Sequence, residues 1–158
     1  NVRGLNTPAR RAYTRRLINQ LNCSVLCLQE TKLAVVSPTL RLDIAGPRLS
    51  GCADRLTAGT RGGIMILWDP DHFHDTVLDV GEFSLTIQLA PCTGEAPWCI
   101  TSVYGPNDDP SRLRFLQELR RIRTLFALPW LAVGDFNLIV TAEDKSSTNL
   151  NRKMMRHF

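Results

Sequence analysis

Several features that define membrane and secreted proteins are missing from this sequence or scarce in it. No apolar run approaches the roughly 20 residues that a helix needs to cross a bilayer, so we expect no membrane partner. No signal peptide precedes Asn1, and we therefore expect an intracellular protein that is not secreted. The five cysteines include no Cys-x-x-Cys pair. This spacing argues against structural zinc and favours buried, reduced thiols.

The length and composition fit one domain. A chain of 158 residues with 44% hydrophobic content can bury one sizeable core. Because the first residue is Asn1 rather than Met, we expect a single domain over residues 1–158 that is truncated at both ends. The formal charge is +4, and the arginines cluster in two segments. These are Arg10, Arg11, Arg15 and Arg16, then Arg112, Arg114, Arg120, Arg121 and Arg123. Such stripes suit a polyanion, but they also occur as ordinary solvated helix faces.

Two amphipathic patterns predict helices. Thr7 is a suitable N-cap and Pro8 a suitable first residue for a helix that ends near Asn22. Its apolar face carries Tyr13, Leu17 and Leu21. A second helix begins at residues 109–110. Its apolar stripe consists of Phe115, Leu119, Ile122 and Phe126. A third, truncated helix is expected at residues 149–158.

Apolar segments bounded by turn residues predict strands. They lie at residues 25–29, 62–68, 76–80, 83–89, 98–104 and 130–134. Apolar and polar residues alternate over 83–89, which predicts one buried and one wet face for that strand. Residues 34–61 have an irregular composition, with a short strand near residues 40–45. Because strands outnumber helices and several neighbours can form hairpins, we expect an α+β fold with sheets packed face to face and helices outside.

Three segments end an apolar run on residues suited to metal and phosphate chemistry. Glu30 follows the first, Tyr104 and Asn107 end the second, and Asp135 and Asn137 end the third. A carboxylate is costly inside a buried strand but can lie at its end, where the sheet meets solvent. Carboxylates bind hard divalent cations, and the amide and phenol can contact a phosphate, with Asn107 as a candidate substrate-binding residue. Each residue also has an ordinary explanation at a turn or sheet edge.

These residues occur in blocks that resemble the endonuclease/exonuclease/phosphatase superfamily. The chain resembles most closely the apurinic-endonuclease-like nuclease domain of plant LINE-type, non-LTR retrotransposons. Six blocks in order carry the resemblance: Asn1-Val-Arg-Gly-Leu-Asn, Leu28-Gln-Glu-Thr-Lys, Gly62-Gly-Ile-Met-Ile-Leu-Trp, Val103-Tyr-Gly-Pro-Asn, Gly134-Asp-Phe-Asn and Asn151-Arg-Lys-Met-Met. The resemblance implies a four-layered α/β/β/α sandwich of the DNase I-like type. Its second sheet is expected to be incomplete, because the chain stops before the last blocks of the family.

The resemblance also implies a role for each candidate residue. Glu30 corresponds to the ligand of a Mg²⁺ ion, with Mn²⁺ as an alternative. Asp135 corresponds to the residue that orients and deprotonates the attacking water, and Asn137 fixes the phosphate or that aspartate. Tyr104 corresponds to a contact of the scissile phosphate, and Asn1 helps to set the geometry of the site. The terminal Asp-His pair of the family has no counterpart, so we expect the chain alone to be weakly active or inert.

The function implied by the resemblance is divalent-metal-dependent nicking of target DNA to prime reverse transcription. We expect a monomer that acts on DNA in the nucleus, with a reverse transcriptase in the parent polyprotein. Two alternatives belong to other classes. The chain could be a noncatalytic transposon remnant with a structural or polyanion-binding role. It could also be a phosphoesterase that acts on lipid or small phosphoesters, because the fold alone does not give the substrate.

Overall fold

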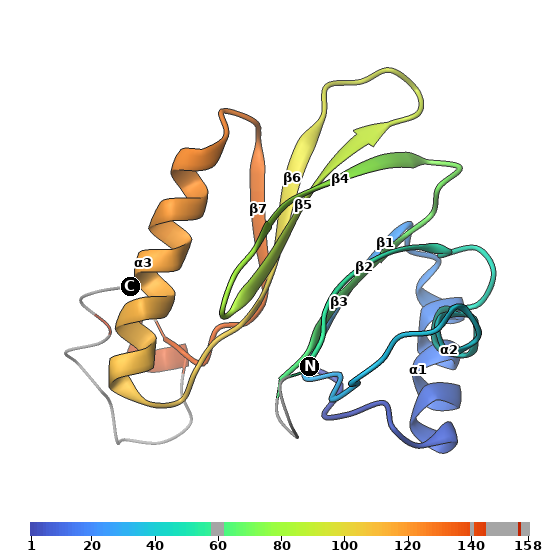
Figure 1. The fold of residues 1–158 in the computed structure, drawn as a ribbon, viewed down its shortest axis with the longest axis horizontal. Helices are drawn as coiled ribbons and strands as arrows, with labels where there is room; N and C mark the ends of the chain where they lie inside the picture. The colour runs from blue at the N-terminus through green and yellow to red at the C-terminus, as the bar shows by residue number, and fades with distance from the viewer. Residues whose placement is uncertain (58–61, 140, 145–154, 156–158) are drawn as a thin grey trace.

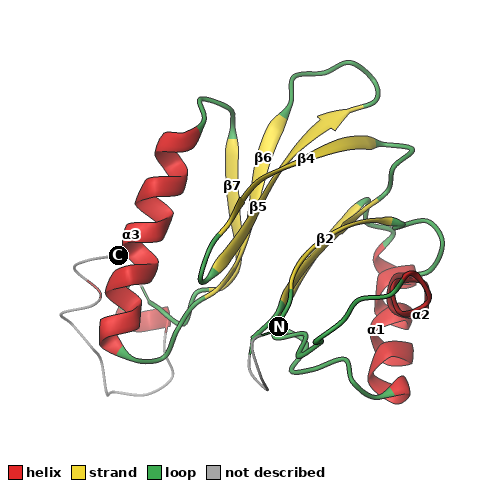
Figure 2. Ribbon diagram, in the orientation of Figure 1, coloured by secondary structure: helices red, strands yellow, loops and turns green. Residues whose placement is uncertain are grey.

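Two β-sheets lie face to face between two layers of helices (Figures 1 and 2). This computed structural model describes residues 1–57, 62–139, 141–144 and 155. The helices are α1 (Pro8–Leu21), α2 (Pro38–Ala45) and α3 (Asp109–Leu125), with a short 3-10 turn, η1 (Ala142–Asp144). Helices α1 and α2 cover the outer face of one sheet, and α3 covers the outer face of the other. The four-layered α+β arrangement predicted from the sequence is confirmed.

The first sheet has the strand order β1-β3-β2 and is antiparallel throughout. Its strands are β1 (Val25–Gln29), β2 (Gly51–Arg55) and β3 (Ile64–Trp68). All five residues of the central strand β3 are buried, because α1 and α2 cover one face and the second sheet covers the other. The strands predicted at residues 25–29 and 62–68 are therefore confirmed.

The interpretation of residues 34–61 was wrong in two places. The strand expected near residues 40–45 is the helix α2, and β2 was not predicted. Ser37 explains the helix, because its hydroxyl accepts a hydrogen bond from the backbone nitrogen of Leu40 at 3.1 Å. Pro38 then occupies the first helical position, where a missing N–H costs nothing. These local capping interactions outweigh the alternating apolar pattern of the segment.

The second sheet has the strand order β4-β5-β6-β7. Its strands are β4 (Phe73–Val80), β5 (Ser84–Pro91), β6 (Trp98–Tyr104) and β7 (Trp130–Asp135). The β4–β5 hairpin is confirmed, and β6 and β7 are parallel and joined through α3. Because the carboxyl ends of parallel neighbours meet at one sheet edge, Tyr104 pairs directly opposite Asp135. The topology therefore brings two of the predicted site residues together.

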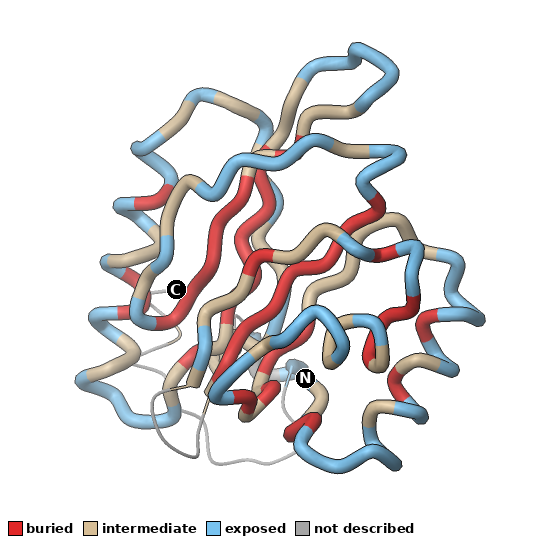
Figure 3. Tube along the Cα trace, turned by 45° about the vertical axis from the view of Figure 1, so that its right-hand side comes forward, coloured by how far each residue is buried: buried red, intermediate tan, exposed pale blue. Residues whose placement is uncertain are grey.

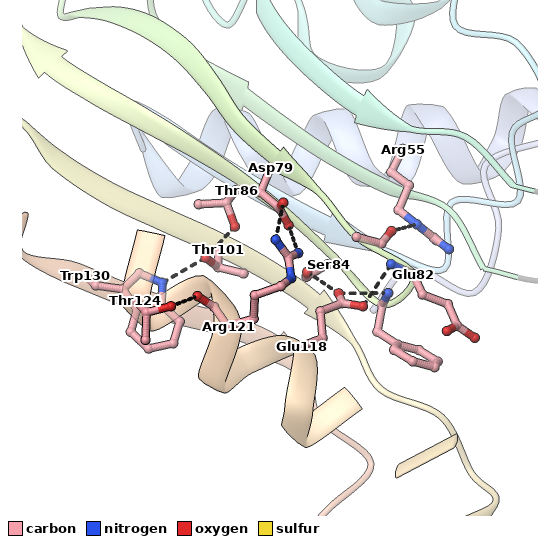
Figure 4. Close-up of polar contacts among 12 residues, drawn as sticks. Arg55, Asp79, Glu82, Ser84, Thr86, Thr101, Glu118, Arg121, Thr124 and Trp130 are labelled. Carbon is pink, nitrogen blue, oxygen red and sulfur yellow. Dashed lines mark hydrogen bonds and ion pairs between the residues drawn. The ribbon is translucent and has the colours of Figure 1, made fainter. Parts of the chain in front are cut away.

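The wet face predicted for β5 is buried. Ser84 and Thr86 are both 0% exposed, because α3 packs over this side of the sheet. Their hydroxyls are satisfied by side chains of α3 and β6, as Figure 4 shows. Ser84 Oγ donates to Glu118 Oε1 at 2.5 Å, and the hydroxyls of Thr86 and Thr101 lie 2.8 Å apart. Trp130 Nε1 also donates to Thr101 at 2.8 Å. Hydroxyl groups can line a covered face when each one is hydrogen-bonded.

Helix α1 also differs from its sequence pattern. The predicted apolar face, formed by Tyr13, Leu17 and Leu21, is 61%, 40% and 68% exposed. The helix instead buries Thr14 and Ile18. The predicted stripe of α3 is confirmed at its centre, where Phe115 and Ile122 are fully buried. Figure 3 shows that the buried segments concentrate in the strands between the helical layers.

The sequence also predicts a third helix and no membrane-spanning segment. The third helix predicted at residues 149–158 lies outside the described residues, apart from residue 155. Among the helices that the structure describes, none combines the length and apolar character needed to cross a bilayer.

Candidate functional site

The ends of β1, β6 and β7 meet at one edge of the sandwich. Gln29, the last residue of β1, is buried and its side-chain nitrogen donates to Ser102 Oγ of β6 at 2.9 Å. This hydrogen bond joins the two sheets directly. It places Glu30, which follows Gln29 along the chain, beside the sheet edge that carries Tyr104 and Asp135.

Asn1 connects the two carboxylates. Its side-chain nitrogen donates to Asp135 Oδ2 at 2.7 Å. A hydrogen bond from the same side chain is one of the causes that lower the pKa of Glu30. Asn1 is held in place because its backbone nitrogen donates to Gln29 Oε1 at 3.2 Å and the backbone nitrogen of Val2 donates to the Gln29 carbonyl at 2.9 Å. Glu30 and Asp135, which are far apart in the sequence, therefore share one neighbour in space.

A lysine also contacts Glu30. Lys32 Nζ lies 2.9 Å from Glu30 Oε1, and this hydrogen bond is the largest cause of the lowered pKa of Glu30. Both residues have left-handed backbone conformations, with φ of +58° at Glu30 and +56° at Lys32. The buried Thr31 between them is fixed through its backbone nitrogen, which donates to the Gly63 carbonyl at 3.1 Å. The loop thus presents Glu30 and Lys32 together.

Asp135 is oriented by the loop that follows it. Its Oδ1 accepts a hydrogen bond from the backbone nitrogen of Asn137 at 3.3 Å. Asn137 has φ of +49°, and its side-chain nitrogen donates to the Gly105 carbonyl at 2.7 Å. Arg112 completes the arrangement by donating from Nη2 to the Asn137 carbonyl at 3.0 Å. The amide of Asn137 is therefore engaged with the neighbouring loop, while its backbone holds the aspartate.

Two glycines permit this close approach. A Cβ at Gly105 would overlap the carbonyl oxygen of Phe136, and a Cβ at Gly134 would overlap that of Val103. Gly134 also has φ of +136°, which side-chain-bearing residues rarely adopt. Gly134 is therefore a point of close approach between β6 and β7.

Of the two remaining candidates, Tyr104 lies at the site and Asn107 does not contact it in the described part of the chain. Tyr104 lies at the same edge, and its ring is near Gly62, whose carbonyl accepts a hydrogen bond from the Lys32 backbone nitrogen at 3.0 Å. Asn107 is exposed, and no contact with Glu30, Asn1 or Asp135 is recorded for it within the described part of the chain. The structure thus brings together five of the six candidates. These are Asn1, Glu30, Tyr104, Asp135 and Asn137.

Residues that support the site were missed by sequence reasoning. Gln29 had a visible signal, because it is a polar side chain at the end of an apolar strand. Lys32 had a weaker signal, because it lies only two residues after the candidate Glu30. Arg112 had none, because it is one of several arginines on an amphipathic helix. Its partner Asn137 is 25 residues away.

The donors present are those of a hard divalent cation. Glu30 and Asp135 offer carboxylate oxygens, and the ammonium of Lys32 beside Glu30 shows that this position accepts a positive charge. Among the described residues, no group of three or more His, Cys, Asp and Glu side chains could hold a metal ion. Mg²⁺ is commonly bound through one or two carboxylates, with water and substrate oxygens completing the shell. Glu30 and Asp135 are therefore the described residues that could hold such an ion.

A layered sandwich with carboxylates at converging strand ends belongs to the DNase I-like class of folds, and similar solved structures support this assignment. The chain belongs to the endonuclease/exonuclease/phosphatase family, whose model matches residues 1–156. Comparison with curated proteins found no match.

Three solved structures illustrate the likeness in fold. A functionally unknown conserved protein from Enterococcus faecalis V583 has 20% identity and a TM-score of 0.60, over 81% of this chain and 58% of that one. A family protein from Bacteroides thetaiotaomicron has 12% identity and a TM-score of 0.58, over 87% and 60%. The human Nocturnin catalytic domain has 19% identity and a TM-score of 0.54, over 93% and 66%. The chain thus spans less than two thirds of each of these chains.

Proposed function

We propose that the protein hydrolyses phosphodiester bonds in DNA with the help of a divalent metal ion. In the host context this activity would nick target DNA to prime reverse transcription. Membership of the endonuclease/exonuclease/phosphatase family supports phosphoester hydrolysis. The observation that carries the proposal for this chain is the position of Asn1, which donates to Asp135 and contributes to the lowered pKa of Glu30.

The side chains divide the chemistry between them. Glu30 and Asp135 are the residues that would hold Mg²⁺, with Mn²⁺ as the alternative. When bound, such an ion supplies positive charge against the charge that develops on the phosphate oxygens. Asp135 would accept the proton of the attacking water, because two hydrogen bonds fix its carboxylate. Tyr104 would donate to a phosphate oxygen from the adjacent strand end.

The wider setting is proposed from the resemblance to LINE-type nucleases. It comprises DNA as the partner, action in the nucleus as a monomer, and a reverse transcriptase in the same polyprotein. The low activity expected of the 158-residue chain alone stays a prediction. Because the expected activity is low, the assay that tests it must detect a single cleavage per DNA molecule.

Nicking of supercoiled plasmid DNA meets that requirement, because one cut relaxes the molecule. We expect slow nicking that requires Mg²⁺ and that falls by about a hundredfold or more in Asp135→Asn, since an oriented acceptor at the reacting water is lost. Asp75→Asn is the matched control, because Asp75 is an exposed residue of β4 outside the site. Equal nicking by both variants would contradict the proposed role of Asp135.

The same preparation separates the alternatives. Absence of nicking together with salt-sensitive DNA binding would favour the noncatalytic, polyanion-binding remnant. Hydrolysis of a phosphoinositide or a small phosphoester in preference to DNA would favour the second alternative, since one fold can serve several substrates.

A further inference from the structure

Arg112 connects the helix α3 to the loop that follows β7. Its Nη2 donates to the backbone carbonyl of Asn137 at 3.0 Å, and its Nη1 donates to Asp109 Oδ1 at 2.9 Å. Only 19% of the Arg112 side chain is exposed, whereas 51% of the Asp109 side chain is exposed. A mostly buried guanidinium group therefore reaches from the first turn of its own helix to the loop beside Asp135.

Asn137 is held by hydrogen bonds in three directions. Its backbone nitrogen donates to Asp135 Oδ1 at 3.3 Å, its side-chain nitrogen donates to the Gly105 carbonyl at 2.7 Å, and its carbonyl accepts from Arg112. The backbone of Asn137 is left-handed, with φ of +49°. Asparagine adopts this conformation more readily than most residues, but still at a cost. The contact with Arg112 holds the Asn137 backbone in the conformation whose N–H faces Asp135.

Stability alone does not explain an arginine at this position. The Nε atom of Arg112 is buried and has no hydrogen-bond partner among the described residues. A buried donor without a partner costs free energy, and an apolar side chain of similar length would avoid that cost. Asp109 is half exposed and can be hydrated, so the group inside the protein that depends on Arg112 is the Asn137 carbonyl. The cost is therefore linked to the loop rather than to α3.

A second arginine of α3 provides a comparison. Arg121 donates from Nη1 and Nη2 to the two carboxylate oxygens of Asp79, at 2.9 and 2.6 Å. Its side chain is 49% exposed, and Asp79 belongs to β4. Because β4 and β7 are the two outer strands of the second sheet, Arg121 attaches the same helix to the edge opposite Asp135.

Apolar packing also holds the loop against α3. The ring centroids of Phe115 and Phe136 lie 6.1 Å apart, and Phe136 and Leu138 pack against the cluster that contains Phe115. Such contacts are non-directional, so they set where the loop lies rather than which way its peptide groups point. A hydrogen bond to the Asn137 carbonyl supplies that direction.

We propose that Arg112 is a positioning residue, which orients the Asp135 carboxylate through the backbone of Asn137. The inference rests on the proposed function, because the orientation matters to the reaction only if Asp135 accepts the proton of the attacking water. Arg112 does not touch the substrate in this role and acts through geometry. A displacement of a reacting group by about 1 Å can lower a rate by about a hundredfold, so a small shift of the loop is sufficient.

The first measurement needs no turnover. Hydrogen exchange of the Asn137 backbone amide, followed by NMR, reports its hydrogen bond to Asp135 relative to the amides of β7. Arg112→Met removes the donors but keeps a long, unbranched side chain, and it should raise this exchange rate by about tenfold. Arg121→Met is the matched control, because it removes a doubly bonded arginine from the same helix and should leave the Asn137 amide unchanged. Urea denaturation verifies that both variants fold.

Nicking of supercoiled plasmid DNA with Mg²⁺ measures the consequence for the reaction. Arg112→Met should lower the maximal rate by about tenfold or more and leave the DNA concentration at half-maximal rate unchanged. Arg112→Lys should recover part of the rate, since an ammonium can still donate to the Asn137 carbonyl. In an Asp135→Asn background, Arg112→Met should have little further effect, because the two residues act through one series of contacts. Arg121→Met should leave the maximal rate unchanged.

The outcomes separate this proposal from the proposed function. Unchanged exchange at Asn137 in Arg112→Met would overturn the positioning role, because the apolar contacts of Phe136 would then be sufficient. An equally large loss of rate in the Asp135→Asn background would also overturn it, because Arg112 would then act by another route. Faster exchange at Asn137 in a chain whose unaltered form nicks no DNA would support the positioning role and contradict the proposed hydrolysis.

Discussion

The charge state of Glu30 depends on its neighbour two residues along the chain. The hydrogen bond and charge of Lys32 favour the ionised carboxylate, so the pKa of Glu30 is lowered. A group with a lowered folded-state pKa stabilises the fold above its unfolded pKa, and this contribution is lost as the pH falls through the folded value. Acidification should therefore weaken this loop only below the ordinary titration range of a glutamate.

Lys32→Met should raise the pKa of Glu30 toward its ordinary value, because it removes the largest favourable interaction. A carbon-13 NMR titration of the Glu30 side-chain carboxyl measures this directly. Lys32→Arg keeps the charge and is the matched control, so its titration should shift much less. An unchanged pKa in the Met variant would show that the ion pair does not govern Glu30.

The sequence was sufficient to predict the position of a site residue wherever that residue directly follows or ends an apolar strand. Glu30 and Asp135 follow apolar strands, and Tyr104 ends another, so their exposure at a sheet edge follows from strand burial alone. The hydrogen bond of Asn1 to Asp135 joins residues 134 positions apart. Its existence could not follow from spacing, because it depends on how the two sheets are stacked.

Elements were predicted well when two signals agreed and poorly when they conflicted. In α1 and α3, capping residues and periodicity agreed on the presence of a helix. In α2, apolar and polar residues alternate from Thr39 to Ile44, as in a strand, whereas Ser37 and Pro38 favour a helix. The face that an element buries is harder to predict than the element itself. Polar Ser84, for example, is buried because a helix that comes later in the chain covers it.

Glu118 of α3 caps the turn of the β4–β5 hairpin. Glu118 accepts hydrogen bonds from the backbone nitrogens of Glu82 and Phe83, at 2.9 and 3.1 Å, and from Ser84 Oγ (Figure 4). Gly81 leaves room for its carboxylate, because a Cβ there would overlap Glu118 Oε1. The helix therefore completes a turn that the hairpin cannot satisfy alone.

Glu118→Ala should lower the free energy of unfolding by about 1–3 kcal/mol, since it leaves three donors without their charged acceptor. Urea denaturation measures the loss. Gln117→Ala is the control, because Gln117 is exposed on the same helix and should change stability by less than about 0.5 kcal/mol. Similar losses in the two variants would mean that the hairpin does not depend on this cap.

At the scale of the whole molecule, the site exists only because the two sheets hold a fixed relation. Gln29 is one of the direct polar links between them, through its hydrogen bond to Ser102. Ser102 also bonds to Cys27, whose pKa is raised to about 12 mainly by burial. The same Gln29 side chain accepts from the backbone of Asn1, and Asn1 reaches Asp135. The same series of hydrogen bonds, from Ser102 through Gln29 and Asn1 to Asp135, therefore contributes to both the stability of the fold and the geometry of the site.

Gln29→Leu should test that connection. It keeps the side chain similar in size but removes the link, so the free energy of unfolding should fall by about 1–3 kcal/mol as a buried hydroxyl loses a partner. The Asn1 side-chain amide should also change its NMR shift, because its support is lost. Gln88→Leu on β5 is the matched control, since the same substitution there touches no contact of the site. If the Asn1 signal were unchanged in Gln29→Leu, the site would be positioned independently of the link between the sheets.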